Sequence, residues 1–514
     1  MTDKSIQSEE DIQSFDISKE KGVERLHAKA VGLIGVLFLT VTGAAPMSAM
    51  LGNVPFGSGF GNGIYIPASF LLATIVLTIF SIGFAAMARR VSSVGGFYSF
   101  ISQGLGRDLG MAAGFASFTC YSVFEASLYG LFAFFANAWF KTHLGIDIPW
   151  IYLALFCVVL ASILSYQDVQ ISAAVLGVAL ILEVIILTIF NFGVMMAPAG
   201  TTSFTTEALN LLAVTTPVAE QKVGEVSIAA GAAAVGIFMA FWSWVGFEMA
   251  PNYAEESVDP KRIIPLSLYL SVIGLGLFYI WTSWCAVSAF PDQGAMLAKA
   301  VGDSSNFFLS PIEQFVGPWA KELMAVLILT SSFACGMAFH NTAARYLYSL
   351  GREGALPKFL GNTHDRYKSP HVASTTQSVL AAVWLGAFAF FLGTNDPTAQ
   401  AYVAVYTMLA ILGTMLLLIL QAVVSIAIIV YFAKNGGGGL FTTIIAPLVA
   451  FVAQVYLVYL LVANLATFGG GGPFGSNIPY IALGILAVGL VWGIALRVLA
   501  PHVHARIGRL VFNE

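Results

Sequence analysis

Charged residues are scarce in this 514-residue chain: Asp, Glu, Lys and Arg together make up 10% of it, whereas a typical soluble domain has about 25%. Hydrophobic residues make up 58%. This composition excludes an ordinary soluble protein. The formal net charge of −4 also lacks the excess of Lys and Arg that favours nucleic-acid binding, so we expect no nucleic-acid partner.

Cysteine is also rare, and the four cysteines lie in apolar stretches without the spacing of a metal or redox motif: Cys120, Cys157, Cys285 and Cys335. We interpret them as small buried hydrophobes. The chain has no GxxxxGK[ST] phosphate-binding loop and no HExxH or GxSxG motif. These absences argue against an ATP-driven pump and against a membrane enzyme, and we expect no metal and no cofactor.

Long apolar runs are abundant. A membrane-spanning helix needs about 20 consecutive apolar residues, and these runs are continuous rather than alternating, which favours helices over a β-barrel. We expect twelve spans, at 29–52, 64–88, 108–139, 149–166, 169–196, 229–255, 264–290, 319–350, 373–393, 400–433, 440–466 and 476–499.

The distribution of Lys and Arg predicts the orientation of the chain. Residues 1–28 are polar and lack the pattern of a signal peptide, so we expect a cytoplasmic tail. With twelve spans, nineteen of the 23 basic residues fall inside, and the four outside are Lys141, Lys222, Lys299 and Lys321. This asymmetry follows the positive-inside rule. We therefore expect both termini (the second at 500–514) in the cytoplasm and the spans in the plasma membrane.

Two spans are interrupted in corresponding places. Residues 42–46 (TGAAP) lie near the middle of the first span, and residues 242–251 (WSWVGFEMAP) lie in the sixth. Gly and Pro free backbone groups, which a membrane tolerates only where protein or a water-filled cavity satisfies them. If spans one to five repeat as spans six to ten, the interruptions match, as in transporters with inverted repeats and a midplane site. An ordinary proline kink is the alternative.

Four further stretches carry motifs. Residues 246–265 contain GFE, AEE and DPKRIIP, residues 341–357 read NTAARYLYSLGREGALP, and shorter motifs occur at 369–373 (SPHVA) and 95–98 (GGFY). The first two stretches and GGFY resemble the GFE…AEE…NPxRxIP, NxxxRxLYxLxRxGxLP and GGxY motifs of the amino acid–polyamine–organocation permease superfamily, and SPHVA resembles the way into span nine in that family. The resemblance extends over about residues 28–435.

This resemblance implies an all-α membrane protein with twelve transmembrane helices: a five-plus-five inverted repeat with broken helices 1 and 6, followed by two C-terminal helices. The repeat core would occupy 29–434, in halves 29–196 and 229–434, and the extra helices 440–499. Two departures weaken the expectation of the usual cradle for a substrate carboxylate. The first-span motif has less glycine than the family's GxG, and residues 84–87 (FAAM) replace a frequent acidic position.

Three carboxylates lie well inside predicted spans, whereas every Lys and Arg lies at a span end or in a loop. A charge at mid-bilayer costs roughly 2.5–3.5 kcal/mol or more, so such residues are functional candidates. Without an intramembrane cation, these carboxylates require a substrate ammonium or a carried proton. The three are Glu125, Glu183 and Glu248.

The roles of these residues follow from the resemblance. In arginine–agmatine and putrescine exchangers a glutamate follows a stacking tryptophan by six residues, so Trp242 would stack on a substrate amine and Glu248 would couple protons. Glu183 stands where relatives often have a lysine, and would bind a cation or a proton. Glu125 would line the pocket. The alternative for each is a structural role, which we favour for His340, a histidine that also lies inside a predicted span.

We therefore expect a secondary transporter for an amino acid or related small amine, coupled to protons. A polyamine or amine exchanger is the alternative, and a channel or membrane enzyme is disfavoured. The expected partners are the substrate, protons and the lipid bilayer. The predicted substrate-binding residues are Thr42, Gly43, Ala44, Ala45, Trp242, Ser243, Trp244, Gly246 and Glu125, and the predicted proton-coupling residues are Glu248 and Glu183.

Overall fold

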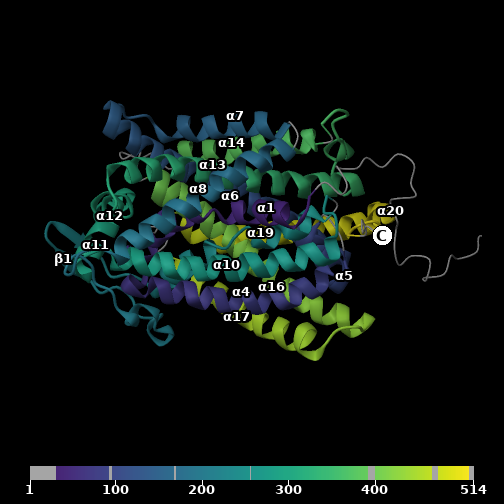
Figure 1. Ribbon diagram of the computed structural model, residues 1–514. Coiled ribbons are helices and arrows are strands. Elements are labelled where there is room, and N and C mark those ends of the chain that lie inside the picture. Colours follow the sequence, from purple (N-terminus) through teal and green to yellow (C-terminus); the bar gives the residue numbers. More distant parts are fainter. Residues whose placement is uncertain are drawn as a thin grey trace, which may run out of the picture.

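A computed structural model shows the chain as a bundle of long helices (Figure 1). The structure describes residues 31–91, 95–166, 169–254, 256–367, 369–391, 400–465 and 473–508. The predicted N-terminal tail, Glu255 of the AEE motif and the last residues of the predicted C-terminal tail lie outside this part of the chain.

The elements follow one another along the chain with short connections. Those before the long loop at 197–228 are α1 (Leu33–Ala44), α2 (Pro46–Ser48), η3 (Ala49–Asn53), α3 (Val54–Gly57), η4 (Ser58–Asn62), η5 (Gly63–Tyr65), α4 (Ile66–Ala88), α5 (Gly96–Leu105), α6 (Arg107–Leu144), α7 (Trp150–Tyr166) and α8 (Val169–Met195). The loop itself holds η6 (Thr206–Leu209), η7 (Leu211–Ala213), β1 (Gln221–Val223) and β2 (Val226–Ile228).

The second part of the chain continues the bundle. Its elements are α9 (Ala233–Trp242), η8 (Phe247–Tyr253), α10 (Pro260–Ser288), α11 (Gln293–Gly302), η9 (Ser304–Asn306), α12 (Leu309–Phe315), α13 (Pro318–Glu353), η10 (Lys358–Gly361), α14 (His371–Phe391), η11 (Gln400–Met408), α16 (Leu409–Asn435), η12 (Phe441–Ile445), α17 (Ala446–Ala463), α19 (Pro473–Leu499) and α20 (Pro501–His504).

The length and apolar character of these helices confirm a polytopic helical membrane protein. Within the described residues, ten helical stretches are long and apolar enough to cross a membrane. The first, Leu33–Ala88, covers two of the predicted spans, and the apolar helix α7 is shorter, at 17 residues. The backbone has no water to bond with in hydrocarbon, so helices that bond internally are the stable form of such runs.

One motif has a clear local purpose at the start of α10. Asp259 stands at the N-cap, where its side chain accepts a hydrogen bond from the backbone N–H of Arg262 (3.3 Å). Pro260 occupies the first turn, where its missing N–H costs nothing. The DPKR sequence therefore sets the beginning of this helix.

The two ends of the bundle differ. Elements β1, α11 and α12 lie at one end, and α5 and α20 lie at the other (Figure 1). Residues 291–318 hold the short helices α11, η9 and α12, whereas the loop at 197–228 holds two short 3-10 helices and the antiparallel hairpin β1–β2. We call these the β1 end and the α20 end.

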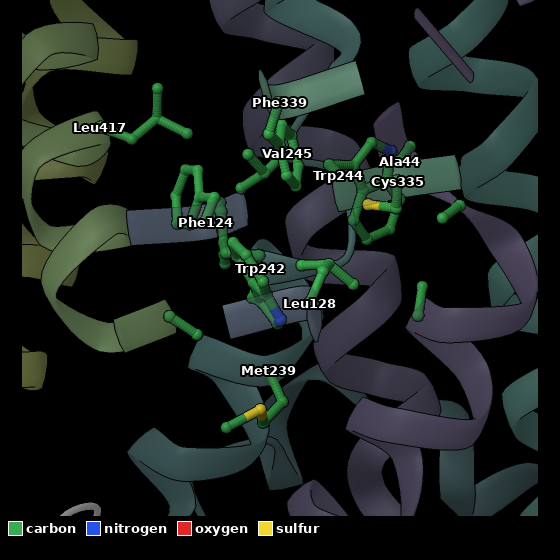
Figure 2. Close-up of a cluster of buried hydrophobic side chains, with 14 of the residues drawn as sticks. Ala44, Phe124, Leu128, Met239, Trp242, Trp244, Val245, Cys335, Phe339 and Leu417 are labelled. Atoms are coloured by element: carbon green, nitrogen blue, oxygen red, sulfur yellow. The ribbon is translucent and has the colours of Figure 1, made fainter. Parts of the chain in front are cut away.

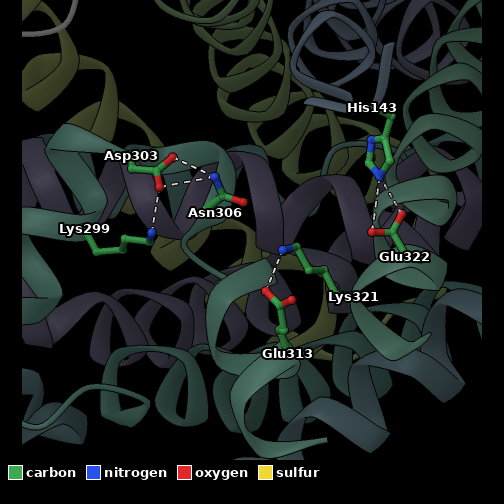
Figure 3. A network of polar contacts seen from close by, with 7 residues as sticks. All are labelled: His143, Lys299, Asp303, Asn306, Glu313, Lys321 and Glu322. Atoms are coloured by element: carbon green, nitrogen blue, oxygen red, sulfur yellow. Dashed lines mark hydrogen bonds and ion pairs between the residues drawn. The ribbon is translucent and has the colours of Figure 1, made fainter. Parts of the chain in front are cut away.

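The β1 end is tied together by exposed or half-buried polar contacts (Figure 3). Lys299 pairs with Asp303 (2.6 Å), and Lys321 pairs with Glu313 (2.5 Å). His143, at the end of α6, contacts Glu322 near the start of α13 (3.2 Å). Exposed pairs of this kind contribute little stability each.

Candidate functional site

The first long helix breaks at Ala45. Helix α1 ends at Ala44, and α2 begins at Pro46. Ala45 has φ +41°, the one positive value for a non-glycine residue in the described part of the chain. A left-handed alanine is strained, so the surrounding contacts must hold it in place.

Side chains from other helices satisfy the backbone groups that this break frees. The Tyr279 hydroxyl donates to the Ala44 carbonyl (3.1 Å), and the Cys335 thiol donates to the Gly43 carbonyl (3.0 Å). Such partners are what an interrupted helix requires at membrane depth. The packing of the neighbouring helices therefore stabilises the break.

The second interruption lies between α9 and η8. Helix α9 ends at Trp242, and Gly246, with φ +126°, precedes the 3-10 helix η8. A side chain at Gly246 would place its Cβ 2.6 Å from the Gly43 carbonyl carbon. The two interrupted segments therefore touch backbone to backbone, which only glycine allows at this position.

A small cavity lies between the two interrupted segments. It has about 20 Å³ of free space, which is room for about one water molecule. Its lining combines predicted residues with others: Gly43, Ala44, Ala45, Ser48, Ala49, Asn53, Leu128, Trp242, Ser243, Val245, Cys335, Phe339 and Tyr406. A metabolite can enter only if the lining elements move apart.

Trp242 forms one wall of the cavity and is buried in aromatic side chains (Figure 2). Its ring lies 4.4 Å from that of Phe124 and 6.3 Å from that of Phe339, measured between centroids. Its indole N–H donates to the Tyr406 hydroxyl (2.9 Å). The ring is thus held by packing on one side and by a hydrogen bond on the other.

Asn53 joins this wall to the first long helix. Its amide donates to the Ser243 hydroxyl (2.8 Å), and its carbonyl oxygen accepts from the Tyr406 hydroxyl. Tyr402, one turn before Tyr406, donates to the Gly52 carbonyl (2.5 Å). These contacts close the cavity between the first long helix, α9 and η11.

Glu248 binds its own interrupted segment. One carboxylate oxygen accepts from the Gly246 N–H (3.0 Å), and the other accepts from the Tyr121 hydroxyl (2.8 Å). The residue is 2% exposed. Glu248 does not line the cavity itself, but it holds the turn that does.

Glu183 binds the other interrupted segment. It accepts from the Met47 N–H (3.3 Å) and from the Ser331 hydroxyl (2.9 Å). Ser48 also contacts Ser331 (3.0 Å). Glu183 therefore connects α8, α2 and α13, and it is 3% exposed.

Other predicted residues lie away from the cavity. Trp244 donates to the Val272 carbonyl (3.3 Å) and packs against Phe70 and Tyr279. It is two residues further along the turn than Trp242, so its side chain points in a different direction. Thr42 is buried and does not line the cavity. The structure therefore places Trp244 outside the cavity lining, away from the substrate contact that we expected for it.

Glu125 is also placed elsewhere. Its carboxylate contacts His340 Nδ1 (3.0 Å) and accepts from the Gln377 amide (2.8 Å), while His340 Nε2 contacts the Ser374 hydroxyl (2.9 Å). This buried cluster joins α6, α13 and α14. These contacts give His340 the hydrogen-bond partners that a structural role requires, and Glu125 lies in this cluster and not among the residues that line the cavity.

A buried ion pair joins α13 to the segment after η8. Arg345 of α13 makes two hydrogen bonds to Glu256, after η8 (2.7 and 3.0 Å), and its guanidinium lies over the Tyr253 ring (4.7 Å). Val31, just before α1, bonds with the backbone of Glu256 (2.9 Å) and Val258 (3.1 Å). For the role that we propose for it below, we call the Arg345–Glu256 pair the inner gate pair.

Sequence reasoning missed the residues that complete the site from other helices. Asn53 was the one detectable signal, as a polar side chain directly after the predicted first span at 29–52. Tyr406, Ser331, Phe339 and Tyr121 resemble ordinary span residues, and their contacts depend on how the helices pack.

Two interrupted apolar helices that touch at their breaks and line a small cavity are typical of transporters among membrane proteins. The sequence profile of the amino acid permease family matches residues 31–489, and the chain belongs to this family, within the amino acid–polyamine–organocation superfamily. The protein is thus a transporter and not an enzyme.

Three characterised relatives illustrate the range of the family. The chain is 24% identical to the low-affinity putrescine importer PlaP of Escherichia coli (strain K12) over 344 residues, covering 66% of this chain and 71% of that protein. It is 32% identical to the gamma-aminobutyric acid permease of the same strain over 28% of this chain and 29% of that one. It is 22% identical to the vacuolar cationic amino acid transporter 4 of Arabidopsis thaliana over 76% of this chain and 62% of that protein.

Proposed function

We propose that the protein is a secondary transporter that moves an amino acid or a related small amine across the plasma membrane together with protons. One observation supports this most strongly. Glu248 and Glu183 each bind the backbone of an interrupted segment, and no Lys or Arg in the described part of the chain forms an ion pair with either. A buried carboxyl without a cationic partner requires a proton or a substrate cation.

The proposed fold has twelve spans in a five-plus-five inverted repeat, with interrupted helices 1 and 6 and two additional C-terminal helices. The breaks at Ala45 and Gly246, in contact with each other, support the repeat. Val31, α5 and α20 lie at one end of the bundle, which fits an even number of spans. We place that end, and therefore both termini, in the cytoplasm.

The proposed substrate site is the cavity between the interrupted segments. Trp242 would stack on the substrate amine, and the backbone around Gly43, Ala44 and Ala45 would contact its polar groups. Ser243 lines the same cavity, whereas the predicted contact residue Gly246 lies outside its lining and packs against Gly43. We propose Glu248 as the proton-coupling residue and Glu183 as a second site for a proton or cation.

A polyamine or amine exchanger is a second candidate. The likeness to a putrescine importer supports it, as does the reduced glycine content of the first-span motif, where a carboxylate cradle would be expected. A diamine needs no such cradle. Its two ammonium groups would instead suit Trp242 and a nearby carboxylate.

A thermal-shift screen of the purified protein tests this proposal directly. Amino acids, diamines and simple amines would be compared with uncharged isosteres of the same shape. A ligand at 100 times its Kd stabilises the folded state by about 2.7 kcal/mol, so true substrates should raise the unfolding temperature in a concentration-dependent way. Equal stabilisation by analogues that lack nitrogen would contradict a cationic substrate.

A further inference from the structure

The last described residues of the chain fold back onto the α20 end of the bundle. Helix α20 turns directly after α19, and Ile507 beyond it is 1% exposed. Gly508 is buried as well. We call residues 501–508 the C-terminal latch. A free terminal segment would expose these residues. Their burial therefore indicates a specific docking site on the bundle, which we call the seat of the latch.

The seat of the latch is built around the backbone of Gly508. The Gly508 N–H lies 3.1 and 3.3 Å from the two Glu353 carboxylate oxygens and 3.1 Å from the Tyr98 hydroxyl oxygen. The Gly508 carbonyl accepts from the Gln103 amide (2.9 Å). Tyr98 and Gln103 belong to α5, and Glu353 ends α13. One residue of the latch is thus bound by two separate elements.

The seat is specific for glycine. Gly508 has φ +67°, and a Cβ added there would lie 2.3 Å from the Ser102 Cβ. Both the backbone conformation and the space exclude larger residues. Tyr98 also donates a short hydrogen bond to Glu353. Burial and the Glu353 charge raise the pKa of Tyr98 well above its usual range, so the hydroxyl keeps the proton that it donates.

A second contact anchors the latch to α6. His504 Nε2 lies 2.9 Å from an Asp108 carboxylate oxygen, and Arg497 of α19 pairs with the same carboxylate. Burial, and then the charges of Arg107 and Arg497, lower the pKa of His504. A neutral His504 can donate a hydrogen bond to Asp108, so the anchor requires no protonation.

Helix α5 connects the latch to the inner gate. A Cβ added at Gly96, the first residue of α5, would lie 2.6 Å from the Asn252 side chain and 2.7 Å from the Tyr346 hydroxyl. Asn252 belongs to η8 and Tyr346 to α13, and the inner gate pair joins α13 to Glu256, three residues beyond the end of η8. The start of α5 therefore lies against the gate, and α5 is bound to the end of α13 both directly, through Tyr98 and Glu353, and through Gly508 of the latch.

We propose that the C-terminal latch is an autoinhibitory clamp on the cytoplasmic gate. When seated, it fixes α5 to α13 and keeps η8 and α13 together, so that the cavity stays closed to the cytoplasm. When released, it allows α5 to move and the gate to open. This inference rests on the proposed function, in which the α20 end faces the cytoplasm and the cavity opens to it.

Cys335 reports gate opening without a transport assay, because it lines the cavity and is buried when the gate is closed. Inside-out vesicles that contain the full chain would be treated with a charged maleimide, and the labelling of Cys335 would be measured by peptide mass spectrometry. Cys120, buried between α6 and α16, serves as the reference for unfolding.

The latch variant is Gly508→Val, and its matched control is Ala505→Val at an exposed position of the same segment. In Gly508→Val we expect the maleimide to label Cys335 roughly fivefold faster or more than in the original chain, which is the lower end of ordinary coupling between two sites. Cys120 should stay protected. Ala505→Val should label at the original rate. A chain truncated after Ala500 should behave like Gly508→Val, and a synthetic peptide of residues 500–514 added in trans should restore slow labelling.

Glu256→Gln separates failure of the latch from failure of the proposed function, because it breaks the inner gate pair directly. Fast labelling in Glu256→Gln, with no change in Gly508→Val and the truncated chain, would overturn the latch and leave the transporter intact. Slow labelling in all variants would overturn both. If Cys120 were labelled together with Cys335, the latch would be a stabilising contact rather than a clamp, which also contradicts the proposal.

Discussion

Trp242 and Trp244 are two residues apart in the sequence, yet the structure gives them different surroundings. Trp242 faces the cavity and is held by Tyr406, whereas Trp244 packs between Phe70 and Tyr279. The sequence marks this segment as unusual through its Gly and Pro. Which aromatic ring faces the cavity depends on the rotation of the turn, and sequence alone does not determine that rotation.

The effect of Trp242→Leu follows from this difference. Leucine keeps an apolar wall but removes the ring face, and a cation–π contact contributes roughly 0.5–2 kcal/mol. We expect substrate binding to weaken by about one order of magnitude, since 1.4 kcal/mol corresponds to a factor of ten. Isothermal titration measures the change. Trp244→Leu is the matched control, and a loss of affinity confined to that control would refute our assignment of the wall.

Glu248→Gln tests proton coupling at the residue scale. Glutamine keeps a side-chain oxygen that can accept from the Gly246 N–H, so the turn should persist, but it cannot release a proton. We expect transport to lose its pH dependence while some exchange remains. Uptake measured across a pH series tests whether the pH dependence is lost. An unchanged pH profile would place the coupling elsewhere, with Glu183 as the next residue to replace.

At the scale of elements, the interrupted helices are the part of the site that the sequence predicts best. Gly and Pro within apolar runs indicate the breaks, and the bilayer thickness sets the helix lengths. The partners that satisfy the freed backbone could not be predicted. Cys335, Tyr279 and Ser331 come from α10 and α13, and nothing in their local sequence indicates which side of each helix faces the break.

Gly246→Ala tests the contact between the interrupted segments. Alanine is disfavoured at φ +126°, and its Cβ would lie 2.6 Å from the Gly43 carbonyl carbon. Backbone strain of this kind costs about 1–3 kcal/mol, so we expect a lower unfolding temperature and the loss of most transport. The matched control is Gly274→Ala in α10, where no atom lies within 4 Å of an added Cβ. Equal behaviour of the two variants would show that the segments need not touch.

At the scale of the whole molecule, the membrane-spanning architecture was predictable because hydrophobicity and length nearly determine it. The different surroundings of the three buried carboxylates could not be predicted. All three occupy apolar runs, but Glu125 has a histidine partner from α13, whereas Glu183 and Glu248 bind the interrupted backbone. Only the packing of helices that are distant in sequence distinguishes the structural carboxylate from the two proposed functional ones.

The closed cavity also has a consequence for the whole molecule. With room for about one water molecule, it can admit a substrate only when contacts at one end of the bundle separate. The contacts among Asn53, Tyr406 and Trp242 close one side of the cavity, and we propose that the inner gate pair closes the path on the other side. This arrangement favours alternating access over a continuous pore, so flux should saturate with substrate concentration.

Uptake into proteoliposomes under an imposed pH gradient tests the central proposal most directly. Purified protein would be reconstituted, and the uptake of radiolabelled amino acids and diamines would be measured with and without the gradient. We predict saturable uptake of at least one amine-containing substrate, stimulated by the gradient and abolished when a protonophore dissipates it. Flux that rises linearly with concentration and ignores the gradient would contradict a proton-coupled secondary transporter.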